Sequence, residues 1–363
     1  MAPRILILAD INSTHTQKWV LGLANDNFTI GIFSFNSSDS DWFANNKNIT
    51  CLNKRQTKAS STLLNKLAYL LLWPKLLYQI YKFKPQVIHS HYASSYGLLG
   101  ALTFFKPFIV SAWGSDVMDF PKKNFLNKLI IKFILFRANK ICVTSTVLKK
   151  EVSQYTKKQV HVIPFGVNLN LFYANDTVSL NDDFVFGIVK NLEPLYNIDK
   201  TIIAFYSLVK RYPDLPLKLK IIGDGSQKEN LNELITYYGL QNNVEMIGFV
   251  AHHQIPSYLN TMDVLVNVSE IESFGVSVAE AMACQIPVIV SNVDGFKDLI
   301  PDESIGLITH STSPFDIGIA MEKYLMNYEL RSILANNAFK RITEKFSWNK
   351  NLNEMEQLYF DIA

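Results

Sequence analysis

Short runs of apolar residues, each followed by a segment of helical character, recur from one end of the chain to the other. These runs lack the polar alternation of half-exposed strands, which is typical of strands covered on both faces. Strands that alternate with helices form βαβ units and parallel sheets. We therefore predict an α/β protein whose strands include "RILILAD" (4–10), "FTIGIFSF" (28–35), "NKICVTS" (139–145), "LKLKIIGDG" (217–225) and "IPVIVSNV" (286–293).

The pattern of strands and helices begins again after residue 181, which indicates two doubly wound domains. A chain of 363 residues is too long for one ordinary core, and 48% hydrophobic residues suffice for two. Ligands of such sheets bind at the carboxyl ends of strands, here expected to face a central cleft. We predict a first domain over 1–168, a linker over 169–182, a second domain over 183–345 and a C-terminal helix over 346–363.

Several protein classes do not fit the composition. Three scattered cysteines are too few for a disulfide framework or a zinc site, and free thiols in a reducing compartment are the interpretation. The first apolar run is too short for a signal peptide, and no uncharged apolar stretch reaches the roughly 20 residues that span a bilayer. We predict a soluble or peripheral protein.

Charge is distributed unevenly along the chain. Residues 51–150 contain 16 Lys and Arg but only two Asp and Glu. Within them, 63–85 and 121–140 combine leucines and aromatic residues with lysines, a composition that binds anionic membranes. The alternative is a pair of ordinary amphipathic core helices with solvated lysines. Nucleic acid is disfavoured, because no nucleic-acid-binding motif accompanies the charge.

Two carboxylates, Glu272 and Glu280, flank a glycine turn in an apolar stretch, with seven residues between them. An unpaired buried carboxylate costs several kcal/mol, roughly, so each needs a hydrogen-bond partner. A helix opens near Val276, and its N-terminus attracts anions. A ligand with both hydroxyl and phosphate groups fits this arrangement. Alternatively, Glu272 caps the helix and Glu280 is a core acid with partners inside the protein.

The segment "ESFGVSVAEAMACQIPV" resembles the signature of the retaining glycosyltransferases of family 4 (group 1), in which seven residues separate two glutamates. Further similar segments occur in family order over nearly the whole chain. They include "VIHSHYASSYGLLGAL", "SAWGSDV", "VIPFGVNLNLF", "IIGDGSQKENLNEL" and the terminal "FSW". The resemblance implies the GT-B fold, with an acceptor-binding first domain, a nucleotide-sugar-binding second domain and a C-terminal helix that crosses back to the first.

The resemblance also implies roles for residues around the signature. Glu280 matches the glutamate that binds the ribose, and Glu272 matches the one beside the donor sugar. Backbone N–H groups of Phe274 and Gly275 would lie near the sugar and diphosphate, and Ser273 belongs to the same donor-binding turn.

Phosphate-binding cations follow the first strand of the second domain in the family. Lys190 matches the first of them. Where relatives have a second, a lysine, this chain has Leu195 and Tyr196, so Lys200 is the remaining candidate. This departure puts the strength of donor binding and the activity in question.

In the first domain, His91 at the end of a strand is the expected catalytic residue on the acceptor side. Trp113 replaces the histidine of many relatives, and Asp116 in the same loop is a further catalytic candidate. His15, in the first loop after a strand, is expected on the acceptor side as well. His89 is expected on the opposite face of its strand, in a structural role.

Together these features imply a retaining hexosyltransferase that uses a UDP- or GDP-linked sugar and a lipid-linked glycan acceptor. The expected process is synthesis of a bacterial surface polysaccharide: lipopolysaccharide, capsule or exopolysaccharide. No metal or other cofactor is expected. The expected location is cytoplasmic, peripheral on the inner face of the plasma membrane. The alternative is a catalytically impaired sugar-nucleotide-binding or scaffold protein of the same fold.

Overall fold

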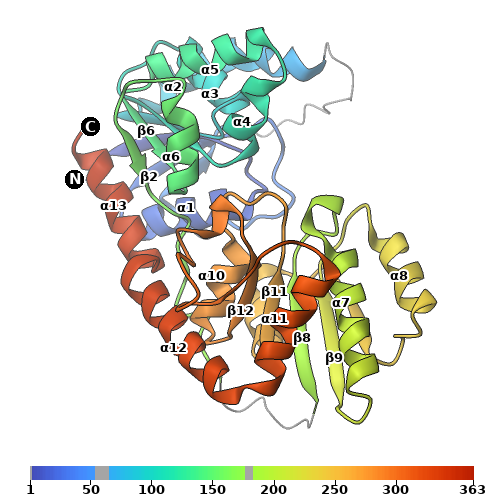
Figure 1. The fold of residues 1–363 in the computed structure, drawn as a ribbon. Coiled ribbons are helices and arrows are strands. Elements are labelled where there is room, and N and C mark those ends of the chain that lie inside the picture. The colour runs from blue at the N-terminus through green and yellow to red at the C-terminus, as the bar shows by residue number, and fades with distance from the viewer. Residues whose placement is uncertain (1, 54–64, 176–182) are drawn as a thin grey trace. The chain divides into compact units, whose positions relative to one another are not determined.

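A computed structural model describes residues 2–53, 65–175 and 183–363 (Figure 1). The chain divides into two compact units, one of residues 1–165 with 350–363 and one of residues 166–349. The C-terminal helix α13 (Trp348–Phe360) thus returns to the first unit, as predicted. The predicted linker is only partly separate, because Phe172 is buried and belongs to the second unit. Its residues 176–182 lie outside the described ranges.

The first unit contains a parallel sheet of seven strands in the order β3-β2-β1-β4-β5-β6-β7. The sheet consists of β1 (Arg4–Leu8), β2 (Thr29–Phe33), β3 (Ile49–Cys51), β4 (Val87–His91), β5 (Phe108–Ala112), β6 (Lys140–Val143) and β7 (Val160–Val162). Its helical segments are α1 (Thr14–Asn25), η1 (Asn65–Leu72), α2 (Trp73–Phe83), α3 (Ser95–Leu102), α4 (Ser115–Met118), η2 (Phe120–Lys122), α5 (Phe125–Arg137) and α6 (Thr146–Ser153).

The second unit contains a parallel sheet of six strands in the order β10-β9-β8-β11-β12-β13. These strands are β8 (Phe184–Val189), β9 (Leu217–Ile222), β10 (Val244–Gly248), β11 (Val264–Asn267), β12 (Val288–Ser291) and β13 (Leu307–Thr309). The helical segments are η3 (Pro194–Tyr196), α7 (Ile198–Arg211), α8 (Lys228–Tyr237), η4 (His252–Gln254), α9 (Ile255–Leu259), α10 (Val276–Ala283), η5 (Asp294–Phe296), α11 (Pro314–Met326) and α12 (Tyr328–Lys345).

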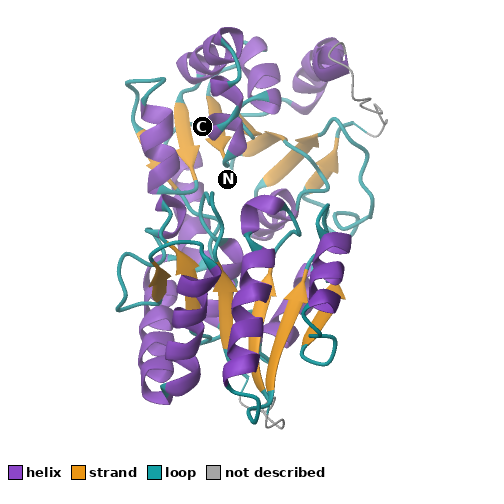
Figure 2. Ribbon diagram, turned by 45° about the vertical axis from the view of Figure 1, so that its right-hand side comes forward, coloured by secondary structure: helices purple, strands orange, loops and turns teal. Residues whose placement is uncertain are grey.

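Each sheet reverses its strand order once, which creates a switch point at its carboxyl edge. In the first unit the reversal lies between β1 and β4, and in the second between β8 and β11. Crossovers in opposite directions place helices on both faces of each sheet, as Figure 2 shows. The loops that leave the two strands of a switch point diverge, and ligands of such folds bind between them. The predicted site residues His15, Lys190 and Glu272 follow these strands and His91 ends one of them, whereas Trp113 and Asp116 follow the adjacent strand β5.

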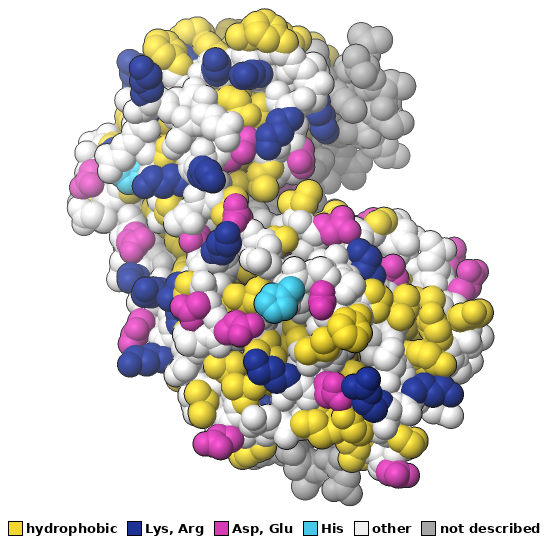
Figure 3. All heavy atoms as spheres, viewed as in Figure 1, with side chains coloured by type: hydrophobic (Ala, Val, Ile, Leu, Met, Phe, Trp, Pro, Cys, Tyr) yellow, Lys and Arg dark blue, Asp and Glu magenta, His cyan; other side chains and the backbone are white. Residues whose placement is uncertain are grey.

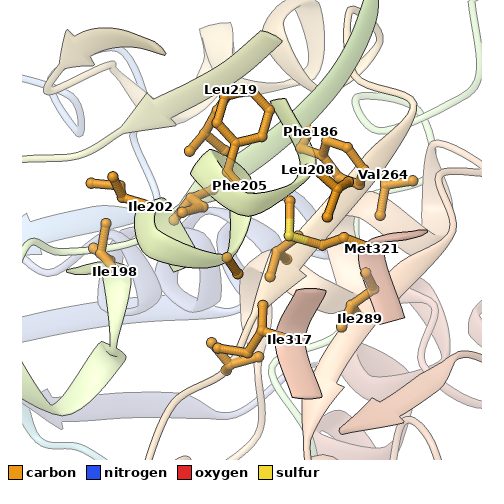
Figure 4. Close-up of a cluster of buried hydrophobic side chains, with 14 of the residues drawn as sticks. Phe186, Ile198, Ile202, Phe205, Leu208, Leu219, Val264, Ile289, Ile317 and Met321 are labelled. Carbon is orange, nitrogen blue, oxygen red and sulfur yellow. The ribbon is translucent and has the colours of Figure 1, made fainter. Parts of the chain in front are cut away.

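The core of the second unit determines where the loops at its switch point lie (Figure 4). On α7, apolar residues recur every three or four positions, so one face of the helix is buried against the sheet. Each such side chain contributes about 1.5–3 kcal/mol on burial. Helices α7 and α11 and strands β8, β9, β11 and β12 supply the labelled side chains Phe186, Ile198, Ile202, Phe205, Leu208, Leu219, Val264, Ile289, Ile317 and Met321.

Candidate active site

Lys190 and Glu272 form an ion pair at the switch point of the second unit. Lys190 directly follows β8, and Glu272 lies in the loop after the neighbouring strand β11. The Lys190 Nζ and Glu272 Oε2 atoms are 2.5 Å apart, and the side chains are 15% and 11% exposed. This strand ends at Asn267, three residues before the expected end near Glu270, so the whole acidic segment 270–272 belongs to the loop.

Tyr196 is one of the two residues, with Leu195, at the position where the family resemblance predicts a second lysine. Its ring lies under the Lys190 ammonium, with 4.4 Å between Nζ and the ring centroid. Burial raises the pKa of the Tyr196 phenol, and the carboxylates of Glu272 and Glu193 raise it further, so the phenol stays neutral. An aromatic face attracts a cation without adding charge. The chain therefore holds Lys190 with a ring instead of placing a second cation at this position.

Lys200 lies on α7 and has partners of its own outside that helix. Its Nζ lies 3.4 Å from Glu270 Oε1 and 3.4 Å from Thr312 Oγ1. The Lys200 side chain is 32% exposed, twice the value for Lys190. The two candidate cations thus pair with different carboxylates of the same loop.

The backbone around Glu272 depends on close approach of a neighbouring loop. A Cβ atom at Gly295, which follows β12, would lie 1.9 Å from the Glu272 carbonyl oxygen, so only glycine fits. The N–H of Ser273 donates to Glu272 Oε1 over 3.0 Å. The Phe274 side chain is buried against Phe346, with 5.6 Å between ring centroids. These contacts hold the turn in one conformation.

Helix α10 begins directly after this turn. Gly275 precedes it with φ +88°, a left-handed backbone conformation that residues with a Cβ adopt at a cost. The first N–H groups of a helix have no partner inside it and carry partial positive charge. Helix α10 thus directs N–H donors to the side of the turn that contains Glu272.

Glu280, in the second turn of α10, is buried and bonded to a histidine that sequence reasoning missed. His252 Nε2–H donates to Glu280 Oε1 over 2.6 Å. The Glu280 side chain is 8% exposed, whereas that of His252 is 42% exposed. The sequence signal for His252 is its position just after the strand of "NNVEMIGFV", at the same sheet edge. No group of three or more potential metal-ligating residues occurs in the described part of the chain.

The predicted acceptor-side residues form an aromatic cluster at the switch point of the first unit. His15 lies in the first turn of α1, rather than in the preceding loop, and its ring stacks on Phe165 at 3.9 Å. Trp113 follows β5, with its ring centroid 4.7 Å from that of His91 and 6.0 Å from that of His15. The structure therefore brings all three predicted residues together.

His91 is buried, and its Nδ1 has no hydrogen-bond partner among the described residues. Burial, and then the nearby charge of His15, lowers its pKa to about 3, so the imidazole is neutral at physiological pH. The expectation that His89 lies on the opposite face was wrong, because residues two apart in a strand share a face. The ring centroids of His89 and His91 are 4.6 Å apart. His89 has the expected structural contacts, to Tyr359 Oη at 2.6 Å and to Ser111 Oγ at 2.7 Å.

Asp116 organises the loops that leave β4 and β5. Its carboxylate is fully buried and accepts hydrogen bonds from the N–H groups of Ala93, Trp113 and Gly114 at 2.5, 3.1 and 2.8 Å. Burial raises its pKa to about 6, although these hydrogen bonds oppose the shift. With both oxygens bonded to backbone, Asp116 positions Trp113. These contacts favour a positioning role over the predicted catalytic one.

Two family models match the chain in succession. Residues 4–145 match the model described as glycosyl transferase 4-like, and residues 172–341 match the one described as glycosyl transferases group 1. The first therefore covers most of the first unit, and the second covers nearly all of the second unit.

Three curated relatives are similar over about three quarters of their own length. An uncharacterized glycosyltransferase of Methanocaldococcus jannaschii is 28% identical over 76% of this chain and 76% of its own. The alpha-monoglucosyldiacylglycerol synthase of Acholeplasma laidlawii is 26% identical over 77% and 76%. The capsular polysaccharide biosynthesis glycosyltransferase CapM of Staphylococcus aureus is 27% identical over 78% and 79%.

Solved structures share the fold over nearly the whole chain. Sucrose-phosphate synthase from Thermosynechococcus elongatus has a TM-score of 0.80 at 20% identity, covering 99% of this chain and 98% of its own. Anabaena HepE, solved in complex with UDP, has a TM-score of 0.79 at 18% identity, covering 99% and 100%.

Proposed function

This chain belongs to the group 1 glycosyltransferases of GT-B fold, and from that premise we propose that it transfers a hexosyl group from a nucleotide diphosphate to a glycan acceptor with retention of configuration. The observation that carries the proposal is the Lys190–Glu272 pair at a switch point, beside the start of α10. A cation, a carboxylate and free N–H groups are the partners that a sugar diphosphate needs.

Donor binding would exchange the partner of Lys190. In the free protein its charge is neutralised by Glu272. A diphosphate carries more negative charge than one carboxylate. It would therefore displace Glu272 from Lys190 and accept hydrogen bonds from Lys190 and from the first N–H groups of α10. Glu272, released from the pair, would then accept hydrogen bonds from hydroxyls of the sugar. Glu280 would accept from hydroxyls of the ribose.

In the transfer step, the bond between the sugar C1 and the phosphate oxygen breaks, and a bond from the acceptor oxygen to C1 forms on the same face. The acceptor proton passes to the leaving phosphate. Lys190 and the α10 dipole stabilise the charge that develops there. His91, neutral at physiological pH, would bind an acceptor hydroxyl, with Trp113 and His15 lining the same place.

The relatives support a lipid-linked acceptor in bacterial surface polysaccharide synthesis. One is named for capsular polysaccharide biosynthesis and another for a glucosylated diacylglycerol. UDP in the crystals of a structural neighbour supports UDP over GDP as the carrier. Besides capsule, the proposal includes lipopolysaccharide and exopolysaccharide as the polysaccharide that the enzyme helps to synthesise.

We place the protein on the cytoplasmic face of the plasma membrane, bound peripherally through the first unit. No helix in the described ranges is long and apolar enough to cross a bilayer. On α5, four large apolar side chains are exposed beside exposed lysines, and Figure 3 shows this mixture of basic and hydrophobic side chains on the first unit. Such surfaces bind anionic lipid. The residues are Phe125, Leu126, Leu129 and Phe136, with Lys122, Lys123, Lys128 and Lys132.

A thermal-shift screen of UDP- and GDP-sugars, followed by a hydrolysis assay of each hit, tests the proposal. A ligand at 100 times its dissociation constant should stabilise the protein by about 2.7 kcal/mol. Slow release of free sugar with retained configuration would support the enzyme. No stabilisation by any sugar nucleotide would contradict it.

The second candidate function is a sugar-nucleotide-binding or scaffold protein with impaired turnover. It is favoured by one observation, the neutral Tyr196 in place of a second phosphate-binding lysine. Stabilisation by a sugar nucleotide without hydrolysis or transfer to any lipid-linked glycan would select this alternative.

We further propose that no metal ion or other cofactor takes part, since Lys190 and α10 supply the positive charge that the diphosphate needs. The rate of sugar release should therefore be unchanged by EDTA. A loss of rate that Mg²⁺ or Mn²⁺ restores would contradict this proposal.

A further inference from the structure

Glu280 has a protein partner that stands partly in solvent. The partner, His252, lies on the short 3₁₀ helix η4 that follows β10, whereas Glu280 lies on α10. The ring of Phe172, a buried residue, lies against His252 with 5.3 Å between centroids. Phe172 thus limits the orientations of the imidazole, and the imidazole in turn limits those of the carboxylate.

Among the residues that the structure describes, only one of the two Glu280 carboxylate oxygens has a hydrogen-bond partner. Within the described residues, the side chain makes a single hydrogen bond, from His252 to Oε1. A buried carboxylate with one acceptor unused is costly unless a further donor reaches it.

We propose that His252 is a positioning residue for the ribose of the donor. It holds Oε1 so that Oε2 is directed to the ribose hydroxyls. The inference rests on the proposed function, in which Glu280 binds the ribose. It adds a residue outside the glutamate signature, from a different strand–helix connection.

The adjacent histidine provides a matched control. His253 is exposed on the same short helix, and its side chain has no bond to any residue that the structure describes. Replacing either histidine by alanine removes the same chemical group. Only the loss of His252 should affect nucleotide binding.

The experiment is calorimetric titration with UDP, with GDP, and with the matching 2′,3′-dideoxynucleoside diphosphates. His252→Ala should weaken binding of the ribonucleotide about tenfold, the equivalent of one charge-assisted hydrogen bond. It should change binding of the dideoxy analogue by less than twofold, because that analogue lacks the hydroxyls that Glu280 accepts. His252→Gln, whose amide can donate from nearly the same place, should restore most of the affinity, and His253→Ala should match the wild type.

Three outcomes would overturn the inference. Unchanged affinity in His252→Ala is one, and equal weakening for the ribonucleotide and the dideoxy analogue is another, since it would indicate a merely structural effect. The third is failure of His252→Gln to restore binding while its melting temperature equals that of the wild type. By contrast, a wild type that binds neither UDP nor GDP would contradict the proposed function itself.

Discussion

Lys190 and Glu272 neutralise each other in a place where little water reaches them. Both side chains are mostly buried, and Tyr196 covers one side of the ammonium. Removing one member of such a pair leaves a buried charge alone, which is costlier than removing both. At the scale of the residue, the pair therefore keeps the phosphate-binding cation in position until a stronger anion replaces the carboxylate.

Glu272→Gln should reduce turnover without weakening nucleotide diphosphate binding. The amide no longer competes for Lys190, so UDP affinity should stay equal or rise, while kcat falls by at least about tenfold because the sugar loses its charged acceptor. Steady-state kinetics and calorimetry on the same variant measure both. A fall in UDP affinity with kcat intact would instead make Glu272 a binding residue.

His91 should make the protein less stable as the pH falls. Its folded pKa of about 3 lies below the ordinary value of 6.5, so between these values the unfolded chain binds the extra proton. Above pH 6.5 the residue is neutral in both states and does not lower the free energy of unfolding. As the pH drops from 6.5 toward 3, its protonation in the unfolded chain lowers that free energy progressively. His91→Gln should reduce the slope of unfolding free energy against pH by about 1.4 kcal/mol per pH unit between pH 4 and 5.5. Urea unfolding at several pH values tests it, and an unchanged slope would contradict a neutral, buried His91.

At the scale of the element, the turn between β11 and α10 is shaped by its neighbours. Gly295 admits the Glu272 carbonyl, and Phe274 anchors the turn to Phe346. Gly275 then allows the backbone to enter α10 with φ +88°. The N-terminus of this helix and Glu272 therefore keep a constant geometry relative to each other, which a binding site requires.

Gly295→Ala should displace the Glu272 turn and reduce turnover at least about tenfold, since an error of 1 Å in a reacting geometry can cost a hundredfold. The control is Gly318→Ala on α11, where an added Cβ has no atom nearer than 4.0 Å. That substitution should raise stability by about 0.5–1 kcal/mol, as alanine does inside helices. Thermal unfolding and turnover of both variants distinguish a local displacement from general loss of structure. Full activity in Gly295→Ala would show that the position of the Glu272 turn does not depend on a glycine at 295.

At the scale of the whole molecule, the two units differ in the charge and in the apolar side chains that they expose. The first half of the chain contains most of the lysines, and α5 exposes apolar side chains among them. Helix α13 completes the first unit, where Tyr359 is fully buried and bonded to His89. The C-terminal segment is thus part of the core of that unit.

Replacing Lys122, Lys123, Lys128 and Lys132 with Gln should weaken binding to anionic vesicles by up to about 4 kcal/mol, at about 1 kcal/mol per lysine. Binding of the wild type should fall as salt rises, because charges are screened over about 10 Å at 0.1 M. Co-sedimentation with neutral and anionic vesicles measures it. The control variant replaces four exposed lysines of the second unit with Gln: Lys210, Lys323, Lys340 and Lys345. An equal loss of vesicle binding in both variants would contradict a specific membrane-binding surface on the first unit.

The sequence by itself determined the features that depend only on residues close together along the chain. Apolar runs of strand length followed by helical periodicity are enough to predict two parallel sheets. The glutamate signature spans a single strand–turn–helix connection, so its spacing places Glu272 before α10 and Glu280 within it. The expected side of His89 was wrong, because residues two apart in a strand share a face, as His89 and His91 do.

Which side chains meet in the candidate site was decided by the order of strands across each sheet, and no local sequence pattern encodes that order. Because β8 lies beside β11, Lys190 meets Glu272 across 82 residues of sequence, and Tyr196 rather than a second lysine faces it. The hydrogen bond from His252 to Glu280 likewise depends on how η4 and α10 meet in space. Partners of buried charges are chosen by tertiary packing, since a charge excluded from water takes whichever donor the fold brings within reach.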